Sequence, residues 1–372
     1  MTPASLIVSA RRVTVKVGSS LLVGQGQDRS QWLKSLAADL AELTGEGKAV
    51  IIVSSGAVAL GRSRANLSKS RRLDAKQAAA AIGQPLLMQA WQSAFAESGK
   101  VTAQLLLTIG DTESRRRWRN ARSTLDMLHR NGAIPIVNEN DSVATEELRY
   151  GDNDRLSARI AQMAGADLLI LLSDVDGLYE ADPRRNPSAK HRDVVETIDE
   201  GLIASAGDAP VAGLGTGGMR TKLEAARIAQ GFGCSTLIAS GVGDHPIAAL
   251  LSGQARATAI RAQGSPVNAY KAWIAGSLAP AGKLVVDEGA VSALLQGRSL
   301  LPSGCHQADG DFAQGSAVIV VDPNGAEVAR GIIRYGAAEA RAILGRKASE
   351  IPTILGYSRG DELIHRDDLV LS

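Results

Sequence analysis

A lysine and several small hydroxyl residues stand where two short apolar runs of this sequence end. Lys16 is followed by the Gly-Ser-Ser of residues 18–20, and the next run ends in the Val-Ser-Ser-Gly-Ala of residues 53–57. Lysine is a compact positive charge, glycine lets backbone approach a ligand closely, and hydroxyls donate and accept hydrogen bonds. These residue types together are suited to holding the oxygens of an anionic ligand.

Further polar segments follow along the chain. They are Asn-Glu-Asn-Asp at 138–141, Gly-Asp-Asn-Asp at 151–154, Ser-Asp-Val-Asp-Gly at 173–177, and the glycine-rich 213–218 ahead of Lys222. Any one of them alone is an ordinary turn. Together with Lys16 they supply two lysines, several carboxylates and several amides. That set indicates phosphoryl transfer, which depends on positioning and on neutralising oxygen charge.

Alternating strands and helices must position these segments. We expect strands at 13–17, 49–53, 101–108, 134–137, 168–172 and 236–239. We expect helices at 31–43, 77–97, 116–130, 154–164 and 221–231, with Pro85 a kink or break in the second. This alternation predicts an α/β fold, with an open, mostly parallel sheet sandwiched by helices. Ligands of such sheets bind beyond the carboxyl ends of the strands, where the polar segments stand.

The pattern changes after residue 260. Short runs at 284–286, 316–321 and 329–333 read as strands separated by glycine-bearing turns. We therefore expect a small, mainly β domain at 280–372, preceded by a linker at 264–279 and a larger domain at 1–263.

Several other site types are excluded or disfavoured. No Gly-x-x-x-x-Gly-Lys-Ser/Thr occurs, so the chain is not a P-loop enzyme. Gly213, Gly215 and Gly218 fit a dinucleotide fingerprint, but no clear strand precedes them and no acid ends the next strand. The five histidines lack paired spacing, and Cys234 and Cys305 lack Cys-x-x-Cys spacing, so we assign no residue as a metal ligand.

The amino-acid composition limits the classes of protein that remain. The chain has 372 residues, 45% hydrophobic and 22% charged, with a formal net charge of +2. No overall field draws it to nucleic acid or membranes, and the dense charge at 115–119 is more typical of a helix start. No targeting segment or apolar run of membrane-spanning length is visible, so we expect a cytoplasmic protein without a membrane partner.

Five motifs occur in a fixed order. They are Lys-Val-Gly-Ser-Ser from Lys16, Val-Ser-Ser-Gly-Ala from Val53, Asn-Glu-Asn-Asp from Asn138, Gly-Asp-Asn-Asp from Gly151, and Gly-Thr-Gly-Gly-Met-Arg-Thr-Lys ending at Lys222. This set resembles the glutamate 5-kinases, a branch of the amino acid kinase family. Val-Asp-Glu-Gly-Ala from Val286 and Arg-Asp-Asp from Arg366 resemble the PUA domain that many bacterial members carry. The resemblance spans about residues 12–370.

The resemblance implies a role for individual residues. Lys16 and Lys222 would hold the phosphates and neutralise the transferring phosphoryl group, and Asp154 would orient both lysines. L-glutamate would be bound by Ser55, Asp141 and Asn153. The nucleotide would be held by Lys16, Ser173, Asp174, Thr216, Gly217, Gly218, Met219, Arg220, Thr221 and Lys222.

The implied reaction converts ATP and L-glutamate to ADP and L-glutamyl 5-phosphate, the first step of L-proline biosynthesis. Mg²⁺ would bridge the phosphates. A carboxylate nucleophile is ionised at neutral pH, so no strong general base is needed. The resemblance also implies inhibition by L-proline and a homo-oligomer, dimer or tetramer, neither of which the sequence tests.

Two alternatives remain. Another kinase of the family could act on carbamate, acetylglutamate, aspartate or uridylate, but the segments at 138–141 and 151–154, together with the tail, argue against each. An RNA-binding protein is the second, because PUA domains are best known from RNA-modifying enzymes. Residues 280–372 hold nine Lys or Arg against twelve Asp or Glu, a net charge of −3. We therefore expect no appreciable RNA binding by the tail.

Overall fold

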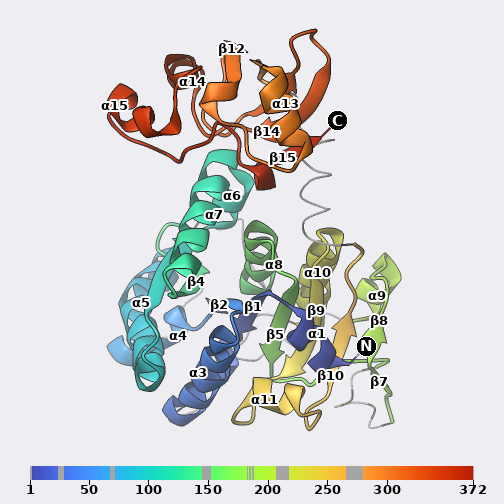
Figure 1. Cartoon of the computed structure of the whole chain (residues 1–372). Coiled ribbons are helices and arrows are strands. Elements are labelled where there is room, and N and C mark those ends of the chain that lie inside the picture. Colours follow the sequence, from blue (N-terminus) through green and yellow to red (C-terminus); the bar gives the residue numbers. More distant parts are fainter. Residues whose placement is uncertain are drawn as a thin grey trace. The chain divides into compact units, whose positions relative to one another are not determined.

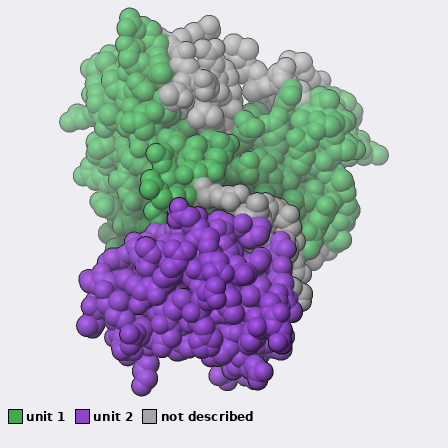
Figure 2. All heavy atoms as spheres, turned by 90° about the horizontal axis from the view of Figure 1, so that it is seen from above, with its two compact units in different colours: residues 1–266 green, residues 267–372 purple. Residues whose placement is uncertain are grey.

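The chain forms two compact units, residues 1–266 and 267–372, which Figure 2 colours separately. The computed structural model describes residues 2–23, 29–67, 72–144, 152–181, 183, 186, 188–206, 218–264 and 280–371. The predicted linker 264–279 lies outside the described residues apart from Gly264, so the domain limits stay predictions.

A large sheet organises the first unit (Figure 1). Its strands are β1 Arg12–Val17, β2 Ala49–Ser54, β3 Thr102–Leu107, β4 Ile134–Glu139, β5 Leu168–Ser173, β8 Val194–Val195, β9 Ser235–Ser240 and β10 Ala257–Ile260. Within the described residues their order is β3-β4-β2-β1-β5-β9-β10-β8. The first six are parallel, and β10 runs antiparallel to β9. The carboxyl ends of six strands therefore meet at one edge, and the predicted mostly parallel sheet is confirmed.

Helices cover both faces of this sheet. They are α1 Pro3–Ser9, α2 Ser19–Leu22, α3 Ser30–Gly45, α4 Ala57–Ala65, α5 Leu73–Phe95, α6 Ile109–Glu113, α7 Arg115–Arg130, α8 Asp152–Ala164, α9 Glu200–Ser205, α10 Met219–Gly231 and α11 Pro246–Leu251. A short 3-10 turn, Ala96–Ser98, follows α5, and β6 Leu178–Tyr179 pairs with β7 His191–Arg192.

The alternation of side chains along each strand explains the two layers. Val13, Val15 and Val17 of β1 are buried in a core shared with α3 and α5. Ile51 and Val53 of β2 point to the opposite face, where they pack with α7 and α8. Lys16, between Val15 and Val17, therefore points to the face that α8 covers.

Two expectations need revision. Of the kink or break expected at Pro85, the break is wrong, because α5 is one helix from Leu73 to Phe95. Proline removes the amide partner of the carbonyl four residues earlier, on Ala81, and both residues are exposed, so water can replace that partner. The residues before β1, which had no assigned role, form α1, and its Leu6 and Ile7 are buried in the core.

The second unit is built on a smaller sheet, which confirms the predicted mainly β tail. Its strands are β11 Gly282–Val286, β12 Cys305–Asp309, β13 Ala317–Val321, β14 Glu327–Ile332 and β15 Leu369–Leu371, in the order β12-β11-β13-β14-β15. Its helices are α13 Glu288–Leu295, α14 Ala337–Ile343 and α15 Ile351–Leu355, with 3-10 turns at Pro302–Gly304, Ala348–Glu350 and Arg366–Asp368. A separate hydrophobic core stabilises this unit.

Candidate active site

Lys16, Asp154 and Lys222 form a buried charge cluster at the carboxyl edge of the large sheet. Lys16 lies near the end of β1, Asp154 lies in the first turn of α8, and Lys222 lies in the first turn of α10. Lys16 Nζ lies 2.6 Å from Asp154 Oδ1, and Lys222 Nζ lies 3.5 Å from Asp154 Oδ2. Their exposed fractions are 7%, 1% and 4%. Three residues predicted to act together are thus in direct contact.

Taken by themselves, Lys16, Asp154 and Lys222 carry one more positive than negative charge, and the exposed Asp174 lies close enough to act on Lys222. Burial alone would raise the pKa of the Asp154 carboxyl, but Lys16 and Lys222 outweigh it and lower the pKa to about 2. Burial lowers the pKa of Lys222, with repulsion from Lys16 in the same direction, although Asp154 opposes both. Buried charge in such excess is costly unless an anion compensates it. The cluster is therefore suited to receiving the phosphates of a nucleotide.

Thr221 completes this region, which we call the lysine half (Lys16, Asp154, Thr221 and Lys222). Its Oγ1 donates to Asp154 Oδ2 over 2.8 Å, and it lies 2.9 Å from the carbonyl oxygen of Gly218. Gly218 precedes α10, so the helix begins beside the charge cluster. The N-terminus of a helix carries free amides and partial positive charge, which favours an anion.

Of the other residues predicted to bind the nucleotide, the structure describes some and not others. Met219 and Arg220 begin α10, and Arg220 is paired with Glu224 at 3.3 Å. Thr216 and Gly217 lie outside the described residues. At the end of β5, Ser173 Oγ donates to Asp174 Oδ1 over 3.0 Å. The exposed Asp174 raises the pKa of Lys222 by its charge, so this carboxylate lies near the lysine half.

Glycine at position 18 leaves space beside Lys16. A Cβ at this position would lie 4.0 Å from Lys16 Nζ and 3.5 Å from the carbonyl oxygen of Leu172. A larger side chain would occupy the volume next to the ammonium group. The Gly-Ser-Ser motif therefore keeps the approach to Lys16 open, as expected for a residue that touches a ligand.

A chain of neutral polar side chains continues the site toward β4. Asn153 Nδ2 donates to Ser55 Oγ over 2.7 Å and to Asn138 Oδ1 over 3.2 Å. Asn138 Nδ2 in turn donates to Gln84 Oε1 over 2.8 Å. We call these four residues, Ser55, Gln84, Asn138 and Asn153, the amide half. Asp141, also predicted for glutamate, lies in the turn after β4, at the same sheet edge.

Sequence reasoning missed two members of the amide half. Asn138 was visible as the first residue of the Asn-Glu-Asn-Asp segment, and its 1% exposed fraction shows that it is a buried polar residue. Gln84 gave no signal, because it stands in an Ala-rich helix between Gly83 and Pro85. The close packing of α5 against α4 brings it within hydrogen-bonding distance of Asn138.

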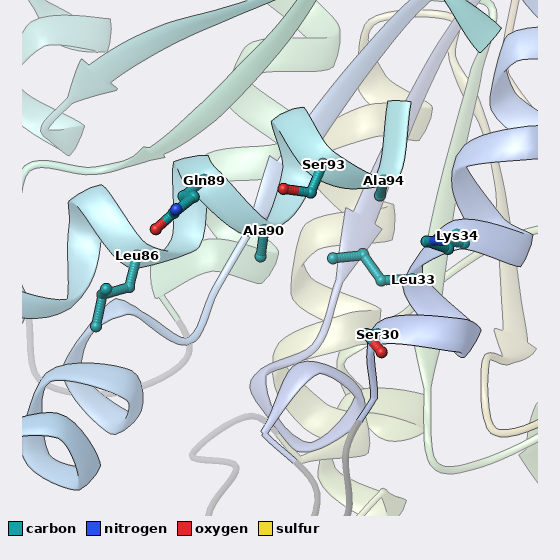
Figure 3. A pocket seen from close by; sticks show the side chains of 8 residues that line it. All are labelled: Ser30, Leu33, Lys34, Leu86, Gln89, Ala90, Ser93 and Ala94. Atoms are coloured by element: carbon teal, nitrogen blue, oxygen red, sulfur yellow. The ribbon is translucent and has the colours of Figure 1, made fainter. Parts of the chain in front are cut away.

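A groove of about 320 Å³ between α3 and α5 is distinct from this site (Figure 3). It is lined by Ser30, Leu33, Lys34, Leu86, Gln89, Ala90, Ser93 and Ala94. Its one charged lining residue, Lys34, is paired with Glu97 at 2.7 Å. None of the predicted site residues lines the groove. Among the helices that the structure describes, none combines the length and apolar character needed to cross a membrane.

The chain is similar to two protein families and to several known proteins. The profile of the Amino acid kinase family matches residues 11–240, and that of the PUA domain matches residues 282–355. The glutamate 5-kinase of Caulobacter vibrioides is 55% identical over 98% of this chain and 97% of its own. Those of Rhizobium rhizogenes and Nitrobacter winogradskyi are 50% and 52% identical, over 100% and 97% of this chain and 96% of their own. Among solved structures, a UMP kinase from Bacillus anthracis matches 69% of this chain and 98% of its own at 17% identity, with a TM-score of 0.45.

Proposed function

The chain belongs to the amino acid kinase family, and we propose that it transfers the γ-phosphoryl group of ATP to the side-chain carboxylate of L-glutamate. The products are L-glutamyl 5-phosphate and ADP, the first step of L-proline biosynthesis. The observation that carries this proposal is the adjacency of a cationic lysine half and a neutral amide half on one sheet edge. The full-length similarity to glutamate 5-kinases supports the choice of acceptor.

The lysine half is assigned to the phosphates. Lys16 and Lys222 neutralise charge that spreads over the phosphoryl oxygens as the bond to ADP breaks. Asp154 positions both ammonium groups through its two carboxylate oxygens. The proposal places the nucleotide against Ser173, Asp174 and the segment from Thr216 to Lys222.

Magnesium is assigned to the nucleotide. Across the described residues, no three His, Cys, Asp or Glu side chains gather in a way that could hold a metal ion. Asp154 already contacts two lysines, and the exposed Asp174, close to the lysine half, is a carboxylate suited to contact a hydrated ion. Mg²⁺ commonly binds through substrate phosphates and one or two carboxylates, so this donor set fits. When bound, the ion supplies further charge neutralisation at the phosphates.

The amide half is assigned to the amino acid. Ser55 and Asn153, with Asp141 nearby on the same edge, offer hydrogen-bonding groups to the charged ends of L-glutamate. The side-chain carboxylate attacks as its ionised form, so the chain needs no base at the reacting oxygen. Its task is to bring two anions together, and the excess positive charge of the lysine half does this.

The test is ADP release with magnesium-ATP in the presence of hydroxylamine, which traps acyl phosphates. L-glutamate is compared with aspartate, acetylglutamate, carbamate and UMP. We expect glutamate-dependent ADP with an equal amount of hydroxamate. Turnover with another acceptor alone would contradict the substrate assignment, and no turnover with any of them would contradict the kinase function. Removing Mg²⁺ with EDTA and then adding it back tests whether the reaction requires the ion.

Catalysis is assigned to the proposed domain at 1–263, since all the site residues named above fall within it. The proposed PUA domain at 280–372 supplies none of them. Cytoplasmic location, L-proline inhibition and a homo-oligomer stay predictions. Fractionation tests the first, kinetics with added L-proline the second, and light scattering the third.

A further inference from the structure

Resting on the function proposed above, we propose that Gln84 is a specificity-determining residue for the amino acid. Its Nε2 donates a hydrogen bond to the α-carboxylate of the substrate, at the end of the site remote from the lysines. Its Oε1 is held by Asn138, so that the amide presents its nitrogen and not its oxygen to the ligand.

The hydrogen bonds of the amide half lead outward from Asn153. Asn153 Nδ2 donates to Ser55 and Asn138, and Asn138 Nδ2 donates to Gln84 Oε1. Two atoms of these side chains are buried and have no hydrogen-bond partner in the described part of the structure: Gln84 Nε2 and Asn153 Oδ1. A buried amide nitrogen without an acceptor is costly, and so is a buried amide oxygen without a donor.

The two unsatisfied atoms differ in chemistry, which points to a ligand with both an acceptor and a donor. A carboxylate would satisfy Gln84 Nε2, and an ammonium group would satisfy Asn153 Oδ1. An α-amino acid carries both groups on one carbon atom. The amide half is therefore complementary to that end of L-glutamate.

The strand order decides which carboxylate Gln84 can meet. Lys16 lies near the end of β1, whereas Asn138, the partner of Gln84, lies near the end of β4, two strands away across β2. Neighbouring strands lie about 4.8 Å apart, so the two positions are separated by roughly 10 Å. The carboxylate that receives the phosphoryl group must lie beside the lysine half. The second carboxylate of L-glutamate, three carbon atoms away, then extends toward Gln84.

Close helix packing fixes the position of Gln84. A Cβ on Gly83 would lie 1.8 Å from the carbonyl oxygen of Ala57, and a Cβ on Gly61 would lie 1.8 Å from that of Ala79. Helices α4 and α5 thus touch backbone to backbone at two glycines. Since α4 begins two residues after Ser55, this contact locks Gln84 beside the exit of β2 and limits the room for it to move.

The decisive variant is Gln84→Glu, which keeps an oxygen for Asn138 but replaces the unsatisfied donor with a second carboxylate oxygen. We compare kcat/KM for L-glutamate with that for L-glutamic acid 1-amide, which retains the reacting carboxylate. We expect kcat/KM for L-glutamate to fall about 100-fold, while the 1-amide, whose own amide can donate to the new carboxylate, loses little. The ratio of the two values then falls at least about tenfold, with KM for ATP unchanged.

Gln89→Glu is the matched control, because it adds the same charge to an exposed position on the same helix. It should leave the ratio at the wild-type value. Gln84→Met, which removes the donor without adding charge, decides the question if the glutamate variant does not fold. It should lower kcat/KM for L-glutamate about tenfold and that for the 1-amide less.

An unchanged ratio in both Gln84 variants, or an equal loss for both substrates, would overturn the role of Gln84 and leave the proposed function intact. Failure of the wild-type protein to release ADP with L-glutamate would instead overturn the proposed function. Calorimetric binding of L-glutamate and its 1-amide to the wild type and to Gln84→Glu tests Gln84 even then.

Discussion

The two halves of the site differ in charge although they share one helix turn. Asp154 faces two lysines, whereas Asn153, the residue before it, faces Ser55 and Asn138. The lysine half is charged and buried, and the amide half is neutral and directional. Charge suits a group whose oxygens gain and lose electron density during transfer. Neutral amides suit a substrate end that must be identified and held still. On the proposed function, one turn of α8 separates the residues assigned to chemistry from those assigned to recognition.

Loss of a lysine should have the largest effect. In Lys222→Met, kcat should fall on the order of 10²–10³-fold, because one of two cations at the transferring group is gone. KM for L-glutamate should change less than about threefold, since the amide half is intact. Steady-state kinetics measure both values. Lys34→Met, which removes a surface lysine paired with Glu97, is the control and should keep both at wild-type levels.

Asp154→Asn should lower the stability of the protein by an amount that depends on pH. The variant leaves two buried lysines without their shared counter-ion, so the free energy of unfolding at pH 7 should fall by about 3–5 kcal/mol. Because folding lowers the pKa of Asp154 from 3.8 to about 2, its contribution is fully present above pH 4 and is lost as the pH falls through 2. Denaturant titrations from pH 7 to pH 2 should therefore show the wild type and the variant converging at low pH. A constant difference would contradict the ion-pair assignment.

A change in the amide half should have a smaller effect than loss of a lysine, and it should act on KM for L-glutamate instead of kcat. Asn153→Ala removes the donor to Ser55 and Asn138, so KM for L-glutamate should rise about 10–100-fold while KM for ATP stays near its wild-type value. Titrating each substrate at saturating levels of the other measures the two constants. An equal rise in KM for L-glutamate and in KM for ATP would contradict the assignment of the two halves to different substrates.

The smallest effect should come from Ser173→Thr. This change keeps the hydroxyl that donates to Asp174, so kcat and both KM values should stay within about twofold. Ser173→Ala removes the hydroxyl and tests it directly. A loss of more than about tenfold in the threonine variant would show that the added methyl group enters the nucleotide site.

The sequence predicts the lysine half better than the amide half for a physical reason. Lys16, Asp154 and Lys222 stand in strand exits and helix starts, where motif and position along the chain indicate the sheet edge. Gln84 stands inside a helix, and its contact with Asn138 spans 54 positions. Such a contact depends on how α5 packs, through Gly61 and Gly83, which no local pattern encodes. The choice between a kink and a break at Pro85 was left open for a related reason, since solvent exposure decides whether the lost hydrogen bond matters.

The most direct test of the division of labour is a paired measurement of kcat and KM for L-glutamate in Lys222→Met and Asn153→Ala. We expect Lys222→Met to lose kcat and keep KM, and Asn153→Ala to raise KM with a much smaller loss of kcat. The same pattern in both variants, or the two patterns exchanged, would contradict the assignment of chemistry to the lysine half and recognition to the amide half.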